Sequence, residues 1–112
     1  MPYLNIQTNI AMTAAQQATV STGGAQRVAQ LLGKSEQYVM VALQAHTTMY
    51  FAGSDEATAF MTLKSIRLPT ERAGELTQQL TSWLTQATSI PKERIYDVNA
   101  GLWGWNERTF GS

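Results

Sequence analysis

Short apolar and β-branched runs, separated by turn residues, predict several strands along the chain. The first covers residues 2–9. A nearly continuous apolar run at 38–43 is typical of a strand that is buried on both faces of a sheet. Further strands are predicted at 59–66 and 94–98, with a short one at 48–52.

Two stretches with apolar residues at three-to-four spacing predict helices. The first covers 14–32, with Thr13 as its N-cap and Gly33 at its C-terminal cap position. A glycine pair at 23–24 leaves two alternatives, a kink or close packing of the helix backbone on a sheet. The second helix covers 71–88, and its apolar stripe is formed by Leu76, Leu80, Trp83, Leu84 and Ala87.

The order of strands and helices occurs twice. The segment 36–41 aligns with 93–98, and the same offset places 2–4 over 59–61. This self-similarity predicts two tandem β-α-β units of similar length.

The two units are expected at about 2–44 and 59–98, within a single domain that covers 1–112. A strand, a crossover helix and a second strand normally give a parallel pair with a right-handed connection. The predicted fold is therefore α+β, a four-stranded mixed sheet with both helices on one face, plus short extra strands.

The composition favours association with other subunits. Hydrophobic residues make up 44% of the 112 residues and charged ones only 14%. A domain of this size buries a modest fraction of its surface by itself. Since one face of the predicted sheet lacks a helical layer, we expect other subunits to cover it.

Charge and residue content argue against several classes of function. The formal net charge is +0, and no basic block supports nucleic-acid binding. No apolar run approaches the roughly 18–20 residues of a membrane helix, and no secretory signal is evident, so we expect a cytoplasmic protein. Cysteine is absent and His46, expected in a loop, is the single histidine, which excludes cysteine zinc sites and a multi-histidine metal site within one chain. We expect no metal site and no cofactor.

Five segments carry a resemblance to a known family. They are Met1-Pro2 with a strand ending at Thr8-Asn9, Gly33-Lys34 with Tyr38-Val39-Met40-Val41, Phe51-Ala52-Gly53-Ser54, Leu63-Lys64-Ser65-Ile66, and the tail from Trp103 to Phe110. In this order and at these intervals, the chain resembles the macrophage migration inhibitory factor family of the tautomerase superfamily over nearly its whole length.

This resemblance implies a homotrimer whose sheets form a barrel, with active sites between neighbouring subunits. It also implies keto–enol tautomerase activity toward phenylpyruvate-like and dopachrome-like compounds, so the expected partners are the chain itself and a small aromatic 2-keto acid. A protein receptor has no support in the sequence.

Pro2 is the candidate catalytic base. If Met1 is removed, the ring nitrogen of Pro2 becomes a free secondary amine; if Met1 stays, the same nitrogen is an amide and no base exists. An ordinary α-amino group has a pKa of about 7.7–8.0. Nearby cations and an apolar wall favour its neutral form. Lys34 and Lys64 are candidate cations, and the candidate wall is formed by Tyr3, Ile66, Trp103, Trp105 and Phe110.

The resemblance also implies substrate-binding residues. Lys34 and the backbone N–H of Ile66 are expected to hold the substrate carboxylate or carbonyl, although Lys34 alone also fits a solvated lysine after a helix. Lys64 stands where vertebrate relatives carry histidine, and it either adds charge to the pocket or points to solvent. Ser65 is expected to position the substrate. Tyr96 fits a tyrosine that a neighbouring subunit contributes.

The C-terminal region departs from vertebrate relatives. Trp103 replaces a smaller apolar residue and is expected to narrow the pocket, with Phe110 in its wall. The chain is a few residues shorter between Tyr96 and Trp105, which leaves the alignment of Tyr96 open. The absence of cysteine also excludes the thiol chemistry of relatives with a Cys-x-x-Cys pair.

Two other functions stay open at this point. One is a trimeric binding or signalling protein with little catalysis, since fold does not determine function. The other is hydration or dehalogenation of a small unsaturated acid. That chemistry would require additional acidic or arginine groups in the pocket, and the sequence places none there.

Overall fold

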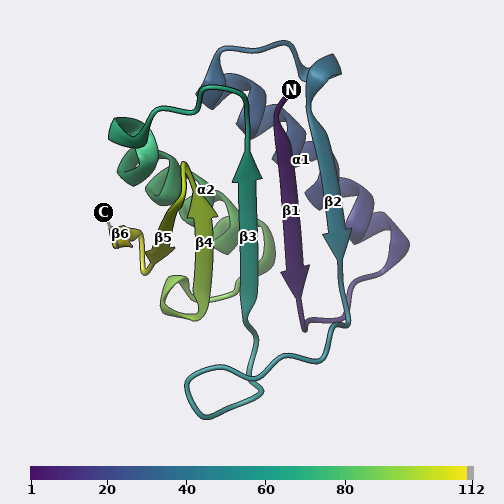
Figure 1. Ribbon diagram of the computed structural model, residues 1–112. Helices are drawn as coiled ribbons and strands as arrows, with labels where there is room; N and C mark the ends of the chain where they lie inside the picture. The colour runs from purple at the N-terminus through teal and green to yellow at the C-terminus, as the bar shows by residue number, and fades with distance from the viewer. Residues whose placement is uncertain (111–112) are drawn as a thin grey trace.

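In residues 1–110, which the structure describes, the computed structural model contains one six-stranded sheet and two α-helices (Figure 1). The strands are β1 (Tyr3–Thr8), β2 (Met40–Gln44), β3 (Ala59–Lys64), β4 (Ile95–Asn99), β5 (Leu102–Trp105) and β6 (Arg108–Phe110). The helices are α1 (Ala14–Leu32) and α2 (Ala73–Thr88), and short 3₁₀ turns occupy Glu36–Tyr38, Thr70–Arg72 and Lys92–Arg94. The last two residues of the predicted domain lie outside the described residues.

The sheet is built from two β-α-β units, as the order of elements predicts. β1 and β2 are parallel and joined through α1, and β3 and β4 are parallel and joined through α2. The units meet where β1 and β3 pair antiparallel, with Tyr3 opposite Lys64. β5 and β6 extend the sheet beyond β4, giving the order β2-β1-β3-β4-β5-β6. Both helices lie on one face (Figure 1), which confirms the predicted α+β arrangement.

Local signals at both ends define α1. The Thr13 side chain accepts a hydrogen bond from the Gln16 N–H at 3.1 Å, and the Gln16 side chain accepts one from the Thr13 N–H at 2.8 Å. Such reciprocal capping satisfies two donors that a helix start would otherwise leave free. Gly33 ends the helix at φ 63°, a left-handed conformation that glycine adopts without steric cost. The predicted bounds of this helix are confirmed.

The glycine pair in α1 brings the helix backbone close to its neighbours. A Cβ atom on Gly24 would lie 3.2 Å from the Trp83 ring of α2 and 3.3 Å from Leu4 of β1. Of the two alternatives for this pair, close packing is therefore the one observed.

The face of the sheet beneath α1 and α2, here called the covered face, carries the core. Both helices are amphipathic, and no helix within residues 1–110 is long and apolar enough to cross a membrane. The predicted stripe of α2 is buried except for Ala87, which is exposed and lines a surface hollow shared with α1. The fully buried apolar side chains include Leu4, Ile6, Met61, Leu76, Leu80 and Leu84.

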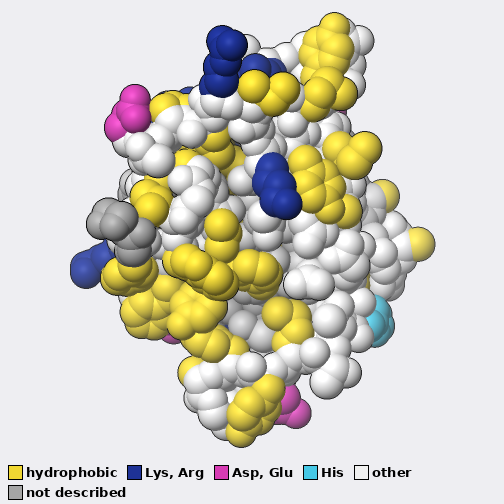
Figure 2. All heavy atoms as spheres, viewed as in Figure 1, with side chains coloured by type: hydrophobic (Ala, Val, Ile, Leu, Met, Phe, Trp, Pro, Cys, Tyr) yellow, Lys and Arg dark blue, Asp and Glu magenta, His cyan; other side chains and the backbone are white. Residues whose placement is uncertain are grey.

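No element of residues 1–110 covers the opposite face, here called the open face. Its large side chains alternate with the buried ones along the strands and include Tyr3, Met40, Phe60, Tyr96 and Trp103. Figure 2 shows that apolar side chains spread over this face. An uncovered apolar surface of this kind indicates an interaction site.

Two strand predictions are wrong in detail. The run at 38–43 is not buried on both faces, because β2 is an edge strand and the Met40 side chain is 65% exposed on the open face. It also begins later than predicted, since Tyr38 belongs to a 3₁₀ turn. The stretch 48–52 forms no strand; within it, Phe51 makes an isolated bridge to Ser54 across a tight turn.

Candidate active site

Pro2 lies immediately before β1, at the end of the sheet that carries the N-terminus. Its carbonyl oxygen accepts a hydrogen bond from the Met40 N–H at 3.0 Å, which fixes Pro2 against the start of β2. Pro2 is buried, whereas the Met1 residue attached to its nitrogen is 72% exposed. The Pro2 nitrogen is therefore held in place by the hydrogen bond of the Pro2 carbonyl to β2 and by the proline ring itself.

A hollow of about 480 Å³ adjoins this terminus. Three elements form it: the N-terminus, the C-terminal end of α1 and the turn from β3 to α2. Among the predicted site residues it brings together Lys34, Ser65 and Ile66, with Met1 beside them. Its remaining lining residues are Leu32, Arg67, Leu68, Pro69 and Arg72.

The residues of this hollow are held in place by local backbone structure. Lys34 follows the α1 cap, and its N–H donates to the Ala29 carbonyl at 3.0 Å. Ile66 stands in the turn after β3, with its side chain 70% exposed. An exposed isoleucine beside a lysine gives the hollow one apolar wall and one positive charge.

Two arginine residues that the sequence analysis did not predict, Arg67 and Arg72, also line the hollow. Arg72 is engaged by Glu75, whose Oε1 accepts from the Arg72 Nε at 2.9 Å and from Nη2 at 2.8 Å. Neither Lys34 nor Arg67 takes part in an ion pair with any residue in 1–110. A signal for Arg67 was present, because it directly follows the Leu63-Lys64-Ser65-Ile66 segment. Dark-blue side chains gather at this end of the molecule in Figure 2.

Lys64 lies beside the hollow, not in it. It is the last residue of β3, opposite Tyr3 on the open face, and its side chain is exposed. It lines a neighbouring depression together with Ser65 and Val98. Of the two alternatives for Lys64, the position in the single chain is closer to a solvent-facing lysine.

Except for Tyr3 of β1, the predicted aromatic residues form a second group, on the strands β4 to β6. Tyr96, Trp103 and Phe110 line a hollow of about 410 Å³ together with Gly104 and Trp105. The Tyr96 and Trp103 rings meet edge to face, with centroids 6.3 Å apart. The Trp105 indole N–H is directed away, since it donates to the Glu93 carbonyl at 2.7 Å.

Phe60 and Phe51 extend this group. Phe60 stacks on Trp103 with centroids 5.7 Å apart, and Phe51 packs edge to face on Tyr96 at 4.8 Å. The guanidinium of Arg94 lies 5.3 Å from the centre of the Phe51 ring. Together these rings make a rigid apolar patch next to β4.

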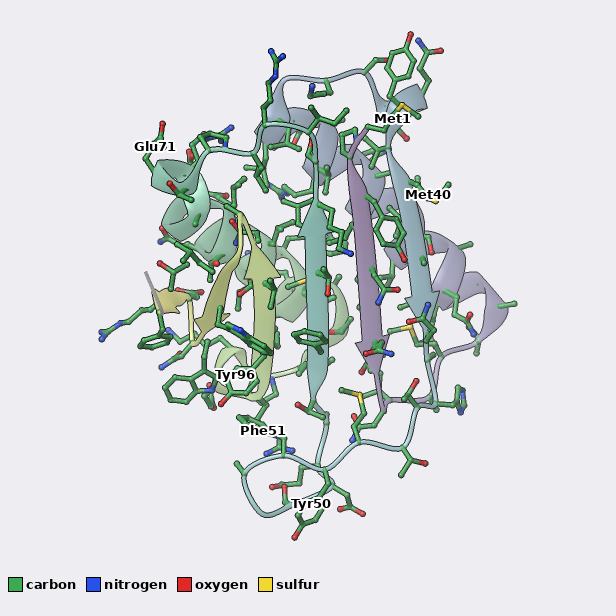
Figure 3. All side chains as sticks on the ribbon, viewed as in Figure 1. Met1, Met40, Tyr50, Phe51, Glu71 and Tyr96 are labelled. Carbon is green, nitrogen blue, oxygen red and sulfur yellow. The ribbon has the colours of Figure 1, made fainter. Side chains whose placement is uncertain are left out.

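The two groups do not meet within one chain. Figure 3 places Met1 and Tyr96 at opposite ends of the sheet. Tyr96, Trp103 and Phe110 therefore cannot form a wall around Pro2 of the same chain. The contribution of Tyr96 from a neighbouring subunit stays a prediction.

Two titratable groups lie outside both hollows. Asp97 is buried between β4 and α2, and burial raises the pKa of its carboxyl, with partial opposition from hydrogen bonds donated by Thr77 and Asn99. His46 lies in a loop, as expected, where its Nε2 accepts from the Met12 N–H at 3.2 Å. Within residues 1–110 no cluster of three or more metal-ligating side chains occurs.

Known proteins are similar to this chain in sequence and fold. A family model described as macrophage migration inhibitory factor (MIF) matches residues 1–111. The MIF homolog of Brugia malayi is 33% identical over 116 residues, covering 99% of this chain and 100% of the relative. The MIF homolog of Trichinella spiralis is 32% identical over 115 residues, covering 98% and 100%.

Solved structures agree with the sequence comparisons. The crystal structure of an MIF homologue from Prochlorococcus marinus matches with a TM-score of 0.76 and 37% identity, over 97% of this chain and 99% of that one. The MIF structure from Trichinella spiralis matches with a TM-score of 0.77 and 29% identity, over 96% and 99%. Because the family model and these relatives cover the chain almost from end to end, the protein belongs to the macrophage migration inhibitory factor family of the tautomerase superfamily.

Proposed function

We propose that the protein is a keto–enol tautomerase that acts on phenylpyruvate-like 2-keto acids, with dopachrome-like compounds as a second substrate class. Family membership supports a tautomerase-like or MIF-like function in general. The finer proposal is carried by the hollow at the N-terminus, which is lined by Met1, Lys34, Ser65 and Ile66. Removal of Met1 would place the free amine of Pro2 beside these residues.

In this proposal Pro2 moves the proton. The neutral nitrogen takes a proton from the carbon next to the keto group, and the electron pair of that C–H bond forms the enolate double bond while charge develops on oxygen. The proton then passes to that oxygen, or returns to carbon in the reverse direction. A fixed amine at the start of a strand suits this role because its direction is set before substrate arrives.

The substrate is held by the other residues of the hollow. Lys34 supplies a positive charge for the substrate carboxylate, and the backbone N–H of Ile66 is a donor for an oxygen. The same charge disfavours the protonated form of the neighbouring amine. Ser65, directly after β3, would position the acid and not react with it.

The assembly we propose is a homotrimer whose sheets form a barrel through their open faces. Large apolar side chains are exposed on this face in a single chain, namely Met40, Trp103 and Phe110. Contacts between subunits would bury them, which supports the proposed assembly. A closed ring of subunits would also bring the aromatic group of one chain toward the N-terminal hollow of the next. Tyr96 would then complete the site across the interface.

The experiment that tests the catalytic proposal is ultraviolet detection of phenylpyruvate enol conversion by the wild-type protein and by Pro2→Gly. Glycine keeps a terminal amine but loses the ring and the secondary nitrogen. We expect kcat/KM to fall by about 100-fold or more, the scale of a lost general base. Intact mass confirms that Met1 is absent in both proteins, and light scattering confirms equal assembly. Unchanged turnover in Pro2→Gly would remove Pro2 from the mechanism.

A second candidate is a trimeric binding or signalling protein of MIF type with little catalysis. Membership of the MIF family favours it, because that membership supports an MIF-like function as well as a tautomerase-like one. The intact mass of the natively expressed protein separates the two. Retained Met1 in a folded trimer without enol conversion favours the second candidate.

A further inference from the structure

Arg67 occupies an unusual place in the turn between β3 and α2. Its φ of 58° is in the left-handed region, which residues other than glycine, asparagine and aspartate seldom adopt. Six other non-glycine residues within 1–110 also have a positive φ, so this conformation fixes the course of the turn and does not by itself mark a site. Arg67 is also part of the hollow at the N-terminus, where it follows Ile66 directly.

The hollow has more positive charge than a substrate with one carboxylate requires. The chain as a whole has a formal net charge of +0 with eight basic residues, yet Lys34, Arg67 and Arg72 line this one hollow. Glu75 engages Arg72 through two hydrogen bonds. The charges of Lys34 and Arg67 have no such partner among residues 1–110.

Apolar residues line the hollow together with these cations. Leu32, Ile66 and Leu68 belong to the same hollow as Lys34 and Arg67. An acid with a carbon body and two anionic groups would use both the apolar residues and the two cations. Guanidinium suits the second anion because its planar fork donates two parallel hydrogen bonds to a carboxylate.

We propose that Arg67 is a specificity-determining residue that binds a second carboxylate, so that the preferred substrates are 2-keto acids with two carboxylates. This inference rests on the proposed tautomerase function, because Lys34 is taken to hold the carboxylate next to the keto group. Arg67 acts by binding and takes no part in the proton transfer.

The test compares two probes that differ by one carboxylate, phenylpyruvate and 4-carboxyphenylpyruvate. The first variant is Arg67→Asn, because asparagine tolerates the left-handed conformation and removes the charge. The second is Arg67→Lys, which keeps the charge but loses the fork. Lys92→Asn is the matched control, since it removes a cation from an exposed site on the 3₁₀ turn before β4, away from the hollow.

We expect wild-type kcat/KM to be higher for the dianionic probe. In Arg67→Asn the ratio of kcat/KM for the dianion to that for the monoanion should fall about 10- to 100-fold, the value of a charged hydrogen bond. The change should appear in KM, because the contact is made equally in the bound substrate and the transition state. The ratio for Arg67→Lys should lie between the ratios for wild type and Arg67→Asn, and Lys92→Asn should keep the wild-type ratio.

Calorimetric binding of both probes separates this inference from the proposed function. Turnover of both probes with the same ratio in wild type and Arg67→Asn overturns the role of Arg67 and leaves the tautomerase proposal intact. Tighter binding of the dianion that depends on Arg67, without any turnover, supports the subsite and overturns the tautomerase proposal. If wild type neither converts nor prefers the dianion, both proposals fall.

Discussion

The covered and open faces of the sheet differ in what their side chains can do. On the covered face, Leu80 of α2 and its apolar neighbours are fully buried against the sheet. On the open face, Met40, Trp103 and Phe110 remain half exposed or more in a single chain. A single chain therefore buries its own core, but it leaves the large apolar side chains of the open face uncovered. Substitutions on the covered face should change folding, and those on the open face should change association and the proposed catalysis.

Two truncations, one on each face, test this difference most strongly: Leu80→Ala on the covered face and Met40→Ala on the open face. We expect Leu80→Ala to lower the free energy of unfolding by about 2–5 kcal/mol at every protein concentration, because it leaves a cavity in the core. The loss in Met40→Ala should instead depend on protein concentration and shrink on dilution, because it arises from weaker contacts between subunits and neither protein is assembled when dilute. Urea unfolding at several protein concentrations measures both. Equal, concentration-independent losses would contradict the distinction between the faces.

A second substitution tests how tightly the covered face is packed near β5. A Cβ atom on Gly104 would overlap the Asp97 carboxylate and lie 2.7 Å from Thr77 Cγ2, so Gly104→Ala requires β5 or α2 to shift. We expect a loss of about 1–3 kcal/mol, the usual result of overpacking.

The matched control for this substitution is Gly74→Ala in the first turn of α2. Its added Cβ would meet only the Thr109 hydroxyl, at 3.8 Å, within van der Waals distance. Alanine favours a helix over glycine by up to about 1 kcal/mol, so this variant should be neutral or stabilised. The thermal unfolding temperature should therefore fall in Gly104→Ala, and it should stay the same or rise in Gly74→Ala. Equal destabilisation of both would mean that the space around Gly104 is not the cause.

Helix α1 and the buried stripe of α2 were predictable because their signals are local. Thr13 and Gly33 mark the ends of α1 in the sequence and in the structure alike. The spacing of Leu76, Leu80 and Leu84 identifies the buried side of α2 without knowledge of any partner. Local capping and periodicity need no tertiary information.

The strand predictions failed where burial depends on neighbours. The apolar run at 38–43 predicts a strand enclosed on both faces, but β2 is an edge strand and Met40 faces outward. The stretch 48–52 forms only a tight turn around Phe51. A sequence records that a residue is apolar, but it does not record whether its cover comes from the same chain.

The residues of the candidate site were likewise predictable only in part. Resemblance to a family placed Lys34, Ser65 and Ile66 together, and they line one hollow. Arg67 escaped notice because its place in that hollow depends on a left-handed turn that its residue type does not favour. Tyr96 belongs to a separate aromatic group, and a single chain cannot show which hollow it serves.

The smallest expected effect concerns Asp97, a carboxyl buried on the covered face beside Thr77 and Asn99. Burial raises its pKa above the ordinary value, which means that the folded state holds this proton more tightly than the unfolded state does. Its contribution to stability is complete below the unfolded pKa, near 3.8, and is lost as pH rises through the folded pKa. The unfolding free energy should therefore decrease as pH rises from the unfolded pKa to the folded pKa of Asp97, and then level off.

Replacing the carboxyl by an amide in Asp97→Asn should remove this decrease and leave the variant slightly more stable than wild type at neutral pH. The amide oxygen can still accept from Thr77 and Asn99, so the packing beneath α2 is kept. The control is Asp55→Asn, at an exposed loop position, which should keep the wild-type pH dependence. Urea unfolding from pH 4 to 8 measures the slope. An Asp97→Asn variant whose slope matches wild type would show that the carboxyl titrates as if it were exposed, and that the covered face opens to water at β4.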